Sequence, residues 1–243
     1  MAGEALRLWG DDRKRGEGEE ARAESDVKAK SRPGVQITER DLEVLGWVSD
    51  QYCVRADVLR HLLGRGAALS ESRTRAVLGR WCRADLVVQR RVFAGLPLVI
   101  WPTREGQRLV RPDWRWRPPS VAMMAHHHQV SVVRLALERP RLENSWVSER
   151  VLLRSRPTPD SHVPDGLLRA PEGDTAVEVE LTQKSSDRLR GIVRELAMDY
   201  PSVLYVAADA TIAHAVEAAA RSVGEEARIR VERLEHFTVP GVG

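Results

Sequence analysis

Hydrophobic and polar residues change their spacing several times along the chain, and each spacing predicts a different element. Thr38-Glu39-Arg40-Asp41 resembles a capping box, and apolar residues follow it at helical spacing, which predicts a first helix. Residues 54–63 and 71–85 continue as a second and a third helix. Strands are predicted next over 86–93 and 98–101, joined by a turn that contains Gly and Pro. Three helices followed by a hairpin predict a winged helix-turn-helix.

The second half of the chain alternates helices with strands, which predicts a mixed sheet with helices on both faces. Together the two halves predict an α+β protein. We expect four parts: a charged tail over 1–34, a winged helix-turn-helix DNA-binding domain over 35–111, a linker over 112–119 and a mixed α/β domain over 120–243. A short helix over 103–110 ends the first domain. In the second domain we expect helices over 120–138, 185–200 and 211–223, and strands over 146–148, 151–154, 203–207 and 228–233, with two more near Asp165 and Glu178.

The third predicted helix has one apolar and one basic side. At 100° per residue, Val77, Leu78 and Trp81 share one side, and small residues sit among the arginines of the other side, where a DNA backbone can come close. In a winged helix-turn-helix this helix lies in the major groove, and the hairpin touches phosphate or the minor groove. The residues that we expect to contact DNA are Ser72, Arg73, Arg75, Arg80, Arg83, Gln89, Arg90 and Arg91. The other interpretation is a small helical domain with a solvated basic face.

The charged residues are distributed unevenly along a chain whose net charge is only +3. Residues 1–34 are neutral overall, residues 35–117 carry a net +6, and residues 118–243 carry a net −3. A basic segment joined to an acidic one indicates that the first meets a polyanion. We therefore expect double-stranded DNA as a partner, whereas residues 1–34, which lack apolar periodicity, are expected to be disordered.

Composition also bears on the cellular compartment. The two cysteines, Cys53 and Cys82, show no paired spacing, which argues against a disulfide framework or a zinc site. No apolar run approaches the roughly 18 residues of a membrane span, and the N-terminus alternates charge where a signal peptide would be apolar. We expect a cytoplasmic protein without a membrane partner.

Acidic residues of two neighbouring predicted strands form the candidate metal site. A turn at Pro171-Glu172-Gly173-Asp174 makes the flanking strands a hairpin, so Asp165 comes near Glu178 and Glu180, which share one face of their strand. Close carboxylates repel one another unless a cation lies between them, and their oxygens suit Mg²⁺ or Mn²⁺. Asp165 and Glu178 are the expected metal ligands. The alternative is a solvated strand face.

A lysine beside these acids adds to the catalytic interpretation. The chain has 34 Arg and four Lys, and Lys184 is the only Lys outside the N-terminal tail. Lys184 lies an even number of residues after Glu178 and Glu180, so its side chain would point to the same face if the strand extends that far. Its ammonium group could position a water or offset developing negative charge. The expected catalytic residues are Asp165, Glu178, Glu180 and Lys184.

The run His126-His127-His128 does not predict a metal site. Consecutive residues on a helix point about 100° apart and do not converge on one ion. We expect His128 to be the one that faces the carboxylates. A tyrosine relaxase would need its histidines on a strand and a nucleophilic tyrosine, whereas Tyr200 ends a predicted helix and is expected to be packed.

The order of elements and acids resembles the PD-(D/E)xK nuclease superfamily, which implies a restriction-endonuclease-like fold for the second domain. Pro164-Asp165 matches its first motif and Glu178 its second, but Glu180 stands where that superfamily has a lysine. Residues 37–207 resemble the plasmid replication-relaxation family, through the Ile37–Asp41 opening, the winged helix, His128 and the acidic motifs. That resemblance implies a role in the replication, relaxation or transfer of a plasmid or mobile element, with replication or transfer proteins as partners.

Two functions remain open. In the first, the winged helix brings DNA to a Mg²⁺-dependent or Mn²⁺-dependent nicking site in the second domain. In the second, the protein is a non-catalytic DNA-binding regulator or scaffold whose carboxylate strand has lost its activity. A homodimer is compatible with both functions.

Overall fold

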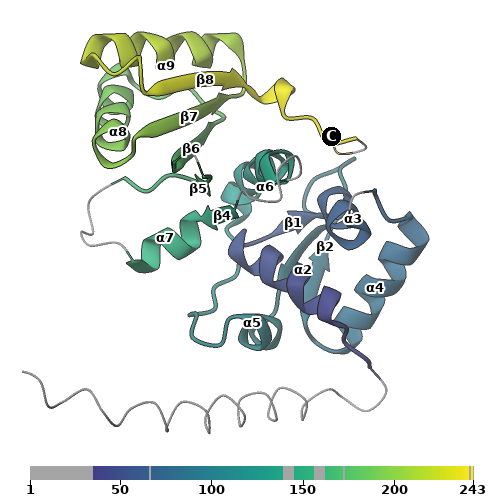
Figure 1. Cartoon of the computed structure of the whole chain (residues 1–243). Helices are drawn as coiled ribbons and strands as arrows, with labels where there is room; N and C mark the ends of the chain where they lie inside the picture. The colour runs from purple at the N-terminus through teal and green to yellow at the C-terminus, as the bar shows by residue number, and fades with distance from the viewer. Residues whose placement is uncertain are drawn as a thin grey trace, which may run out of the picture.

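The computed structural model describes residues 35–65, 67–138, 145–155, 162–171, 173–240 and 242 of the 243-residue chain. Over these residues it is a mixed α+β fold with eight α-helices and two sheets (Figure 1), which confirms the predicted class. The expected disorder of residues 1–34 lies outside the described residues.

Residues 35–110 form four helices and a small antiparallel sheet with the strand order β1-β3-β2. The capping box at Thr38 is confirmed, because its side chain accepts a hydrogen bond from the Asp41 N–H while the Asp41 carboxylate accepts one from the Thr38 N–H. The elements are α2 (Glu39–Asp50), β1 (Val54–Arg55), α3 (Ala56–Gly64), α4 (Glu71–Arg83), β2 (Val87–Arg90), β3 (Val99–Pro102) and α5 (Arg104–Val110).

Strand β1 corrects the prediction of a helix that starts at residue 54. Val54 pairs with Ile100 and Arg55 with Val99, so these two residues are extended, and the helix begins only at Ala56. The partner strand lies more than forty positions away in sequence. Local periodicity could not reveal it. The strand predicted over 86–93 is likewise shorter, since pairing with β3 ends at Arg90.

Residues 121–236 form a second, five-stranded sheet with its helices. Its strand order is β4-β5-β6-β7-β8, antiparallel from β4 to β6 and parallel from β6 to β8. The predicted β5–β6 hairpin is confirmed. The elements are η1 (Val121–Met123), α6 (Met124–Glu138), β4 (Ser145–Ser148), α7 (Glu149–Ser155), β5 (Gly166–Arg169), β6 (Thr175–Glu180), α8 (Ser186–Asp199), β7 (Ser202–Ala207), α9 (Ala210–Val223), β8 (Ile229–Arg233) and η2 (Leu234–His236).

The strand predicted over residues 151–154 is wrong, because these residues belong to helix α7. Val151, Leu152 and Leu153 form a short apolar run, and such a run does not distinguish a buried strand from one turn of a helix. Arg150, which precedes the run, turns inward and is buried, whereas Leu153 is exposed. The other helices and strands of this half lie within two residues of their predicted bounds, except that the helix predicted from residue 120 starts with the 3-10 helix η1 and becomes α-helical only at Met124.

Helices cover both faces of the five-stranded sheet, as predicted. Side chains of α8 and α9, including Leu196 and Val216, pack against Tyr205 on one face. Val133 of α6 packs against Val177 and other strand residues on the opposite face. Both faces of β6 are therefore buried, which determines the surroundings of its two glutamates.

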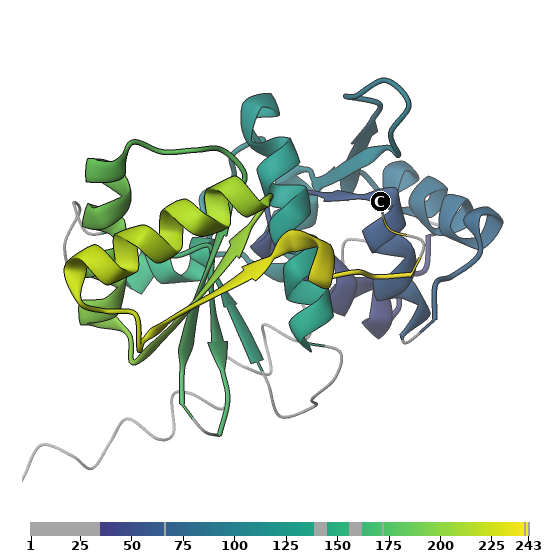
Figure 2. The same cartoon turned by 90° about the horizontal axis from the view of Figure 1, so that it is seen from above.

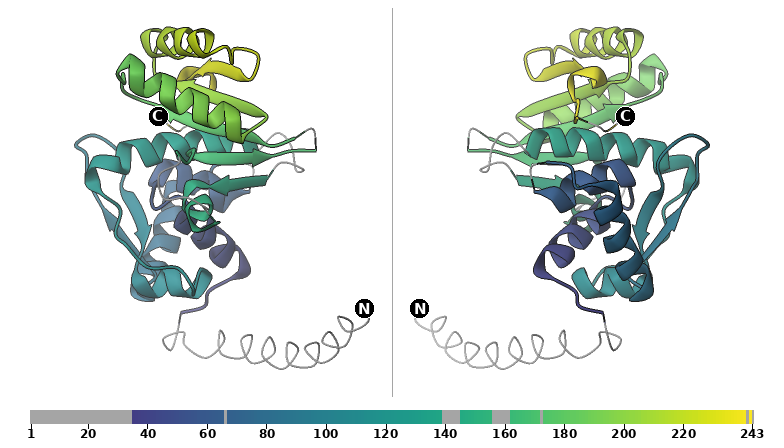
Figure 3. Two further views of the ribbon diagram at one scale, coloured as in Figure 1. Left: turned by 90° about the vertical axis from the view of Figure 1, so that its left-hand side faces the viewer. Right: turned by 90° about the vertical axis from the view of Figure 1, so that its right-hand side faces the viewer.

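Helix α6 also packs against the first half of the chain (Figure 2), so the two hydrophobic cores meet at this helix. Val132 and Leu135 belong to the core formed by residues 44–100, and the indole N–H of Trp47 donates to a Glu138 carboxylate oxygen at 2.9 Å. Helices α8 and α9 lie at the opposite end of the molecule from α4 (Figure 3).

After β8 the chain returns to the first half (Figure 1), where Val239 and Pro240 reach α3. Val239 is buried in the first core, and the His61 Nε2 atom lies 2.7 Å from the carbonyl oxygen of Pro240. No helix of the described part is long and apolar enough to cross a membrane.

Candidate functional site

Strand pairing brings Asp165 and Glu178 together. Gly166 pairs with Val177, so the antiparallel register places Asp165, one residue earlier, opposite Glu178, one residue later. The Asp165 Oδ2 atom accepts a hydrogen bond from the Val179 N–H at 2.8 Å. The predicted proximity of the two acids is confirmed, and the carboxylate of Asp165 is oriented by the backbone of β6.

Glu178 and Glu180 do not lie on a solvated strand face. Their exposed fractions are 5% and 4%, because α8 and α9 cover the face of β6 toward which they point. Burial, and after it the negative charge of Asp165, raises the pKa of Glu178. Two buried acids at the end of one strand are costly unless a cation or a proton compensates them.

The positive charge of Lys184 offsets the negative charge of Glu180. Strand β6 ends at Glu180, so Lys184 does not continue the strand as the parity argument required. It lies in the loop before α8, and its ammonium group forms an ion pair with the Glu180 carboxylate. Burial lowers the pKa of Lys184, and the charges of Glu178 and Asp165 oppose that change. The structure thus brings all four predicted catalytic residues to one end of β6.

His126, and not His128, faces the carboxylates, which corrects the prediction for the histidine run. The His126 Nε2 atom lies 2.6 Å from Asp165 Oδ1. Burial disfavours the charged ring, but the hydrogen bond to Asp165 and its charge outweigh burial, so the pKa of His126 is raised. His128 is buried, with the charges of Arg55 and Asp57 acting on it.

His162 approaches Glu178 from the segment before β5. Its Nε2 atom lies 3.1 Å from Glu178 Oε2, the distance of an ion pair. Its own backbone N–H donates to a Glu195 carboxylate oxygen on α8 at 2.9 Å. Asp165 and Glu178 therefore each have one histidine beside them.

Glu149, the first residue of α7, is a fourth acid of this cluster. Its backbone N–H donates to the carbonyl oxygen of Asp165 at 3.1 Å. Burial, and then the charge of Asp165, raises the pKa of Glu149 to about 7. We define the carboxylate cluster as Asp165, Glu178, Glu180 and Glu149, together with His126, His162 and Lys184.

The pKa of Glu149 makes stability depend on pH. In the unfolded chain this acid ionises near pH 4.5 and in the folded chain near pH 7, so folding becomes less favourable as pH rises between these values. We expect Glu149→Gln to raise the free energy of unfolding by about 1–3 kcal/mol at pH 8 and to change it little at pH 4.5. Thermal unfolding in a chelating buffer measures this difference.

The matched control for this prediction is Glu226→Gln, which removes an exposed carboxylate. It is expected to change stability little at either pH. A Glu149→Gln protein that is less stable than wild type at pH 8 would contradict the prediction, because the ionised carboxylate would then be a stabilising group.

Tyr52 connects the carboxylate cluster with the first half of the chain. It follows α2 in a left-handed conformation, with φ at 64°, which is uncommon for a residue other than glycine. Its ring stacks on His127 with 4.7 Å between centroids, and the Arg150 guanidinium lies 4.9 Å from the ring centroid. A small cavity beside Tyr52 is lined by Glu149 and Asp165 among others.

The carboxylate cluster supplies donors that suit a divalent cation only in part. Asp165 and Glu178 offer hard oxygen atoms, and Glu178 Oε2 is buried without a hydrogen bond. In the described part of the chain, however, no three His, Cys, Asp or Glu side chains are arranged to hold a metal ion by themselves. Mg²⁺ is commonly held by one or two carboxylates, with water and phosphate completing the shell, and Asp165 and Glu178 fit that role.

The predicted DNA-contacting residues lie on α4 and on the hairpin of β2 and β3. Ser72, Arg73, Arg75 and Arg83 are exposed along α4, and Gln89, Arg90 and Arg91 are exposed at and after the end of β2. Arg75 lies 3.8 Å from Glu71 within the same helix, an exposed pair of little energetic weight. These side chains are placed where a polyanion can reach them.

Arg80 differs from the other arginines of α4. Its Nη2 atom lies 2.6 Å from Oδ2 of Asp41, whose side chain is buried. Asp41 also caps α2, so Arg80 ties α4 to the start of α2. We assign Arg80 a structural role first, since leaving Asp41 unpaired in the core is costly.

Sequence reasoning missed His126, His162 and Glu149 as members of the carboxylate cluster. The one feature of the sequence that could have indicated His162 is its position two residues before Pro164, next to the acidic motif. Comparison with known proteins adds no family: no family model matches the chain, and no curated protein is significantly similar to it. The predicted resemblances to the PD-(D/E)xK superfamily and to the plasmid replication-relaxation family therefore stay predictions.

Proposed function

We propose that the protein binds double-stranded DNA through residues 35–111, as a winged helix-turn-helix. The order α2-β1-α3-α4-β2-β3 supports this assignment, with α4 as the recognition helix and the β2–β3 hairpin as the wing. The single observation that carries the proposal is the row of exposed arginines on α4, beside the exposed end of β2. The arginine side chains can contact phosphates, and the net charge of +6 over residues 35–117 attracts a polyanion.

The geometry of α4 also suits close approach to a groove. Ser70 caps the N-terminus of the helix and accepts a hydrogen bond from the Arg73 N–H. On the outer side, Ala76 is exposed and Gly79 is partly exposed, so no large side chain separates the arginines from a ligand. The wing is braced by Arg91, whose guanidinium donates to the carbonyl oxygen of Leu96.

The test is the salt dependence of DNA binding by an Arg73→Ala, Arg83→Ala double variant. If each arginine contacts a phosphate, affinity falls by about tenfold or more, and the slope of log affinity against log salt decreases by about 1 per lost contact. Fluorescence anisotropy with a labelled duplex at several salt concentrations measures both quantities.

The control is Arg194→Ala with Arg221→Ala, which removes two exposed arginines from α8 and α9 and produces the same change of net charge. It is expected to leave the slope unchanged. If both double variants lose the same DNA affinity, binding depends on net charge alone. If the α4 variant keeps its affinity, the DNA interface lies elsewhere.

A second candidate function is metal-dependent nicking of the bound DNA at the carboxylate cluster. The observation that favours it is the approach of Asp165 to Glu178, with Glu180 and Lys184 beside them. The element order α6-β4-β5-β6-α8-β7, with α7 inserted, is compatible with the predicted PD-(D/E)xK resemblance. Asp165 and Glu178 would hold Mg²⁺ or Mn²⁺, which stabilises charge on a phosphate when bound. Lys184 would hold Glu180 in position.

Nicking of supercoiled plasmid in the presence of Mg²⁺ or Mn²⁺ tests the second function. Asp165→Asn and Glu178→Gln are expected to reduce nicking at least about 100-fold while DNA binding stays intact, whereas the exposed control Glu226→Gln retains activity. A wild-type protein that binds tightly and cleaves with neither metal would instead be a regulator or scaffold. The role in plasmid replication, relaxation or transfer rests on the sequence resemblance alone.

A further inference from the structure

We infer that strand β8 pairs with β8 of a second copy of this chain, so that two five-stranded sheets join in an antiparallel twofold dimer. Strand β8 is the last strand of its sheet, and no described strand pairs with its outer side. An unpaired edge of this kind is a template for another strand. This inference does not depend on the proposed DNA binding.

The hydrogen bonds of β8 show which residues face outward. The Val203 N–H on β7 donates to the carbonyl oxygen of Arg228 at 2.9 Å, so Arg228 faces β7. Because successive residues of a strand alternate, Arg230 and Glu232 also direct their backbone groups to β7. Val231 and Arg233 direct their backbone N–H and C=O groups away from β7, toward the free edge of the sheet. A twofold axis at Val231 lets the two copies of this residue exchange both backbone hydrogen bonds.

Charge complementarity selects this register. With the axis at Val231, Arg230 lies opposite Glu232 of the second copy, and the pair occurs twice. The two side chains are on the same face of the strand, with exposed fractions of 66% and 34%, and their charged groups already lie 3.9 Å apart within one chain. Opposite charges in directly opposed positions stabilise a strand pair.

Neighbouring registers place like charges opposite each other. An axis at residue 230 opposes two Arg230 side chains, and an axis at residue 232 opposes two Glu232 side chains. An axis at residue 229 sets Arg228 against Arg230. Like charges in such positions are destabilising, so the order of charges on β8 acts against these alternatives.

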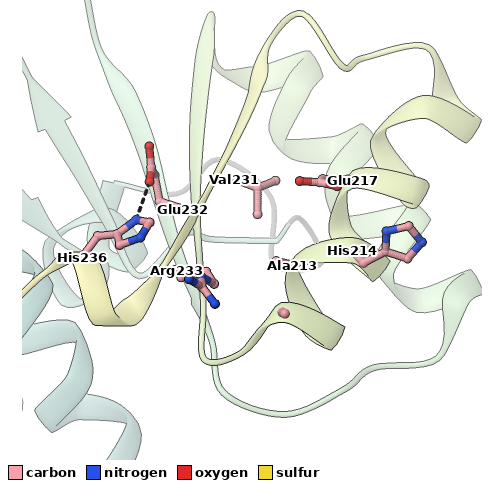
Figure 4. A pocket seen from close by; sticks show the side chains of 8 residues that line it. Ala213, His214, Glu217, Val231, Glu232, Arg233 and His236 are labelled. Atoms are coloured by element: carbon pink, nitrogen blue, oxygen red, sulfur yellow. Dashed lines mark hydrogen bonds and ion pairs between the residues drawn. The ribbon is translucent and has the colours of Figure 1, made fainter.

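A surface hollow lies beside the edge at which the second strand would pair. It has a volume of about 370 Å³ and lies between α9 and β8, lined by Ala213, Glu217 and Val231 among others. Figure 4 shows the side chains of Val231 and Glu217 pointing toward one another, while His236 turns to Glu232. Val231 of the second copy, opposed to Val231, lies on the same face and reaches the mouth of this hollow.

Charge reversal tests the interface. We expect sedimentation velocity of the full chain to show a monomer–dimer equilibrium. Arg230→Glu and Glu232→Arg are each expected to weaken the dimer by about tenfold or more, since each creates two like-charge contacts. The double variant with both changes restores the opposite charges and is expected to recover the wild-type dissociation constant. Arg221→Glu, on the exposed side of α9, is the control without an effect.

Disulfide trapping tests the register independently. In a Cys82→Ser background, Val231→Cys is expected to form a linked dimer on oxidation, because directly opposed residues have the Cα separation of a disulfide. Arg233→Cys is the control, since its two copies lie four positions apart in this register. A wild-type chain that stays monomeric, a double variant that folds but does not recover, or equal trapping at both positions would overturn the inference.

Discussion

Replacing Arg150 by methionine is expected to lower the free energy of unfolding by about 2–4 kcal/mol. Arg150 is buried, and its guanidinium donates to the carbonyl oxygen of Ser49 at 2.7 Å and to Oε1 of Gln107 at 2.6 Å. It also lies over the rings of Tyr52 and Trp114. Methionine fills part of the space but leaves two buried acceptors without a donor. The melting temperature is expected to fall by roughly 5–15 °C.

Arg154→Met is the matched control for this experiment. Arg154 lies one turn further along α7, is exposed, and donates to the carbonyl oxygen of Asp113. Its loss is expected to cost less than about 1 kcal/mol, because an exposed donor can be replaced by water. Similar melting temperatures for the two variants would show that the buried contacts of Arg150 do not hold the two halves together.

The effect of Arg150 is expected to extend to the carboxylate cluster. Arg150 follows Glu149 directly, and Ser49 and Gln107 belong to α2 and α5 of the first half of the chain. It is therefore the side chain through which the start of α7 is attached to that half. Arg150→Met is expected to reduce nicking more than DNA binding, if the second proposed function holds.

Gly166→Ala is expected to destabilise the protein by about 2–3 kcal/mol, the second large effect. A Cβ atom at residue 166 would lie 1.9 Å from Cζ2 of Trp146 on the paired strand β4. The indole is rigid and buried, so either the ring or the strand must move. Since Gly166 follows Asp165, the shift is also expected to displace that carboxylate from Glu178. Chemical denaturation and the nicking assay measure the two consequences.

Gly191→Ala is the matched control, because the same substitution is expected there to stabilise the protein. Gly191 lies within α8, and a Cβ atom there has no neighbour within 4 Å. Alanine is favoured over glycine in a helix by about 0.5–1 kcal/mol, so stability is expected to rise. Trp146→Leu should cost less in the Gly166→Ala background than in wild type, and equal costs would contradict the proposed clash.

Most elements of the fold were predictable from local patterns. Caps and hydrophobic periodicity act over only a few residues, so they can be recognised in the sequence alone. Examples are the capping box at Thr38, the amphipathic spacing of α4 and the apolar run of β7. The strand and the α-helix that prediction missed are β1 and α7. Both are short, and their conformations depend on partners far away in sequence, Ile100 for β1 and the core contacts of Arg150 for α7.

The candidate site was predictable only along the hairpin. Asp165 and Glu178 lie on strands joined by a short turn, so their proximity follows from parity and register. His126 lies 39 positions before Asp165 and meets it only because α6 packs against the sheet. The exchange of roles between His126 and His128 has the same origin, since the direction of each ring depends on the rotation of α6 about its axis.

The sequence by itself determined the α+β class, the basic first half, the β5–β6 hairpin and its pair of acids, because these follow from short-range spacing and composition. Only the tertiary structure decided that Glu178 and Glu180 are buried, that Arg80 is tied to Asp41, and that α6, Val239 and Val242 pack into the first core. The physical reason is that burial and pairing are properties of surfaces that meet, and the surfaces here come from segments far apart along the chain.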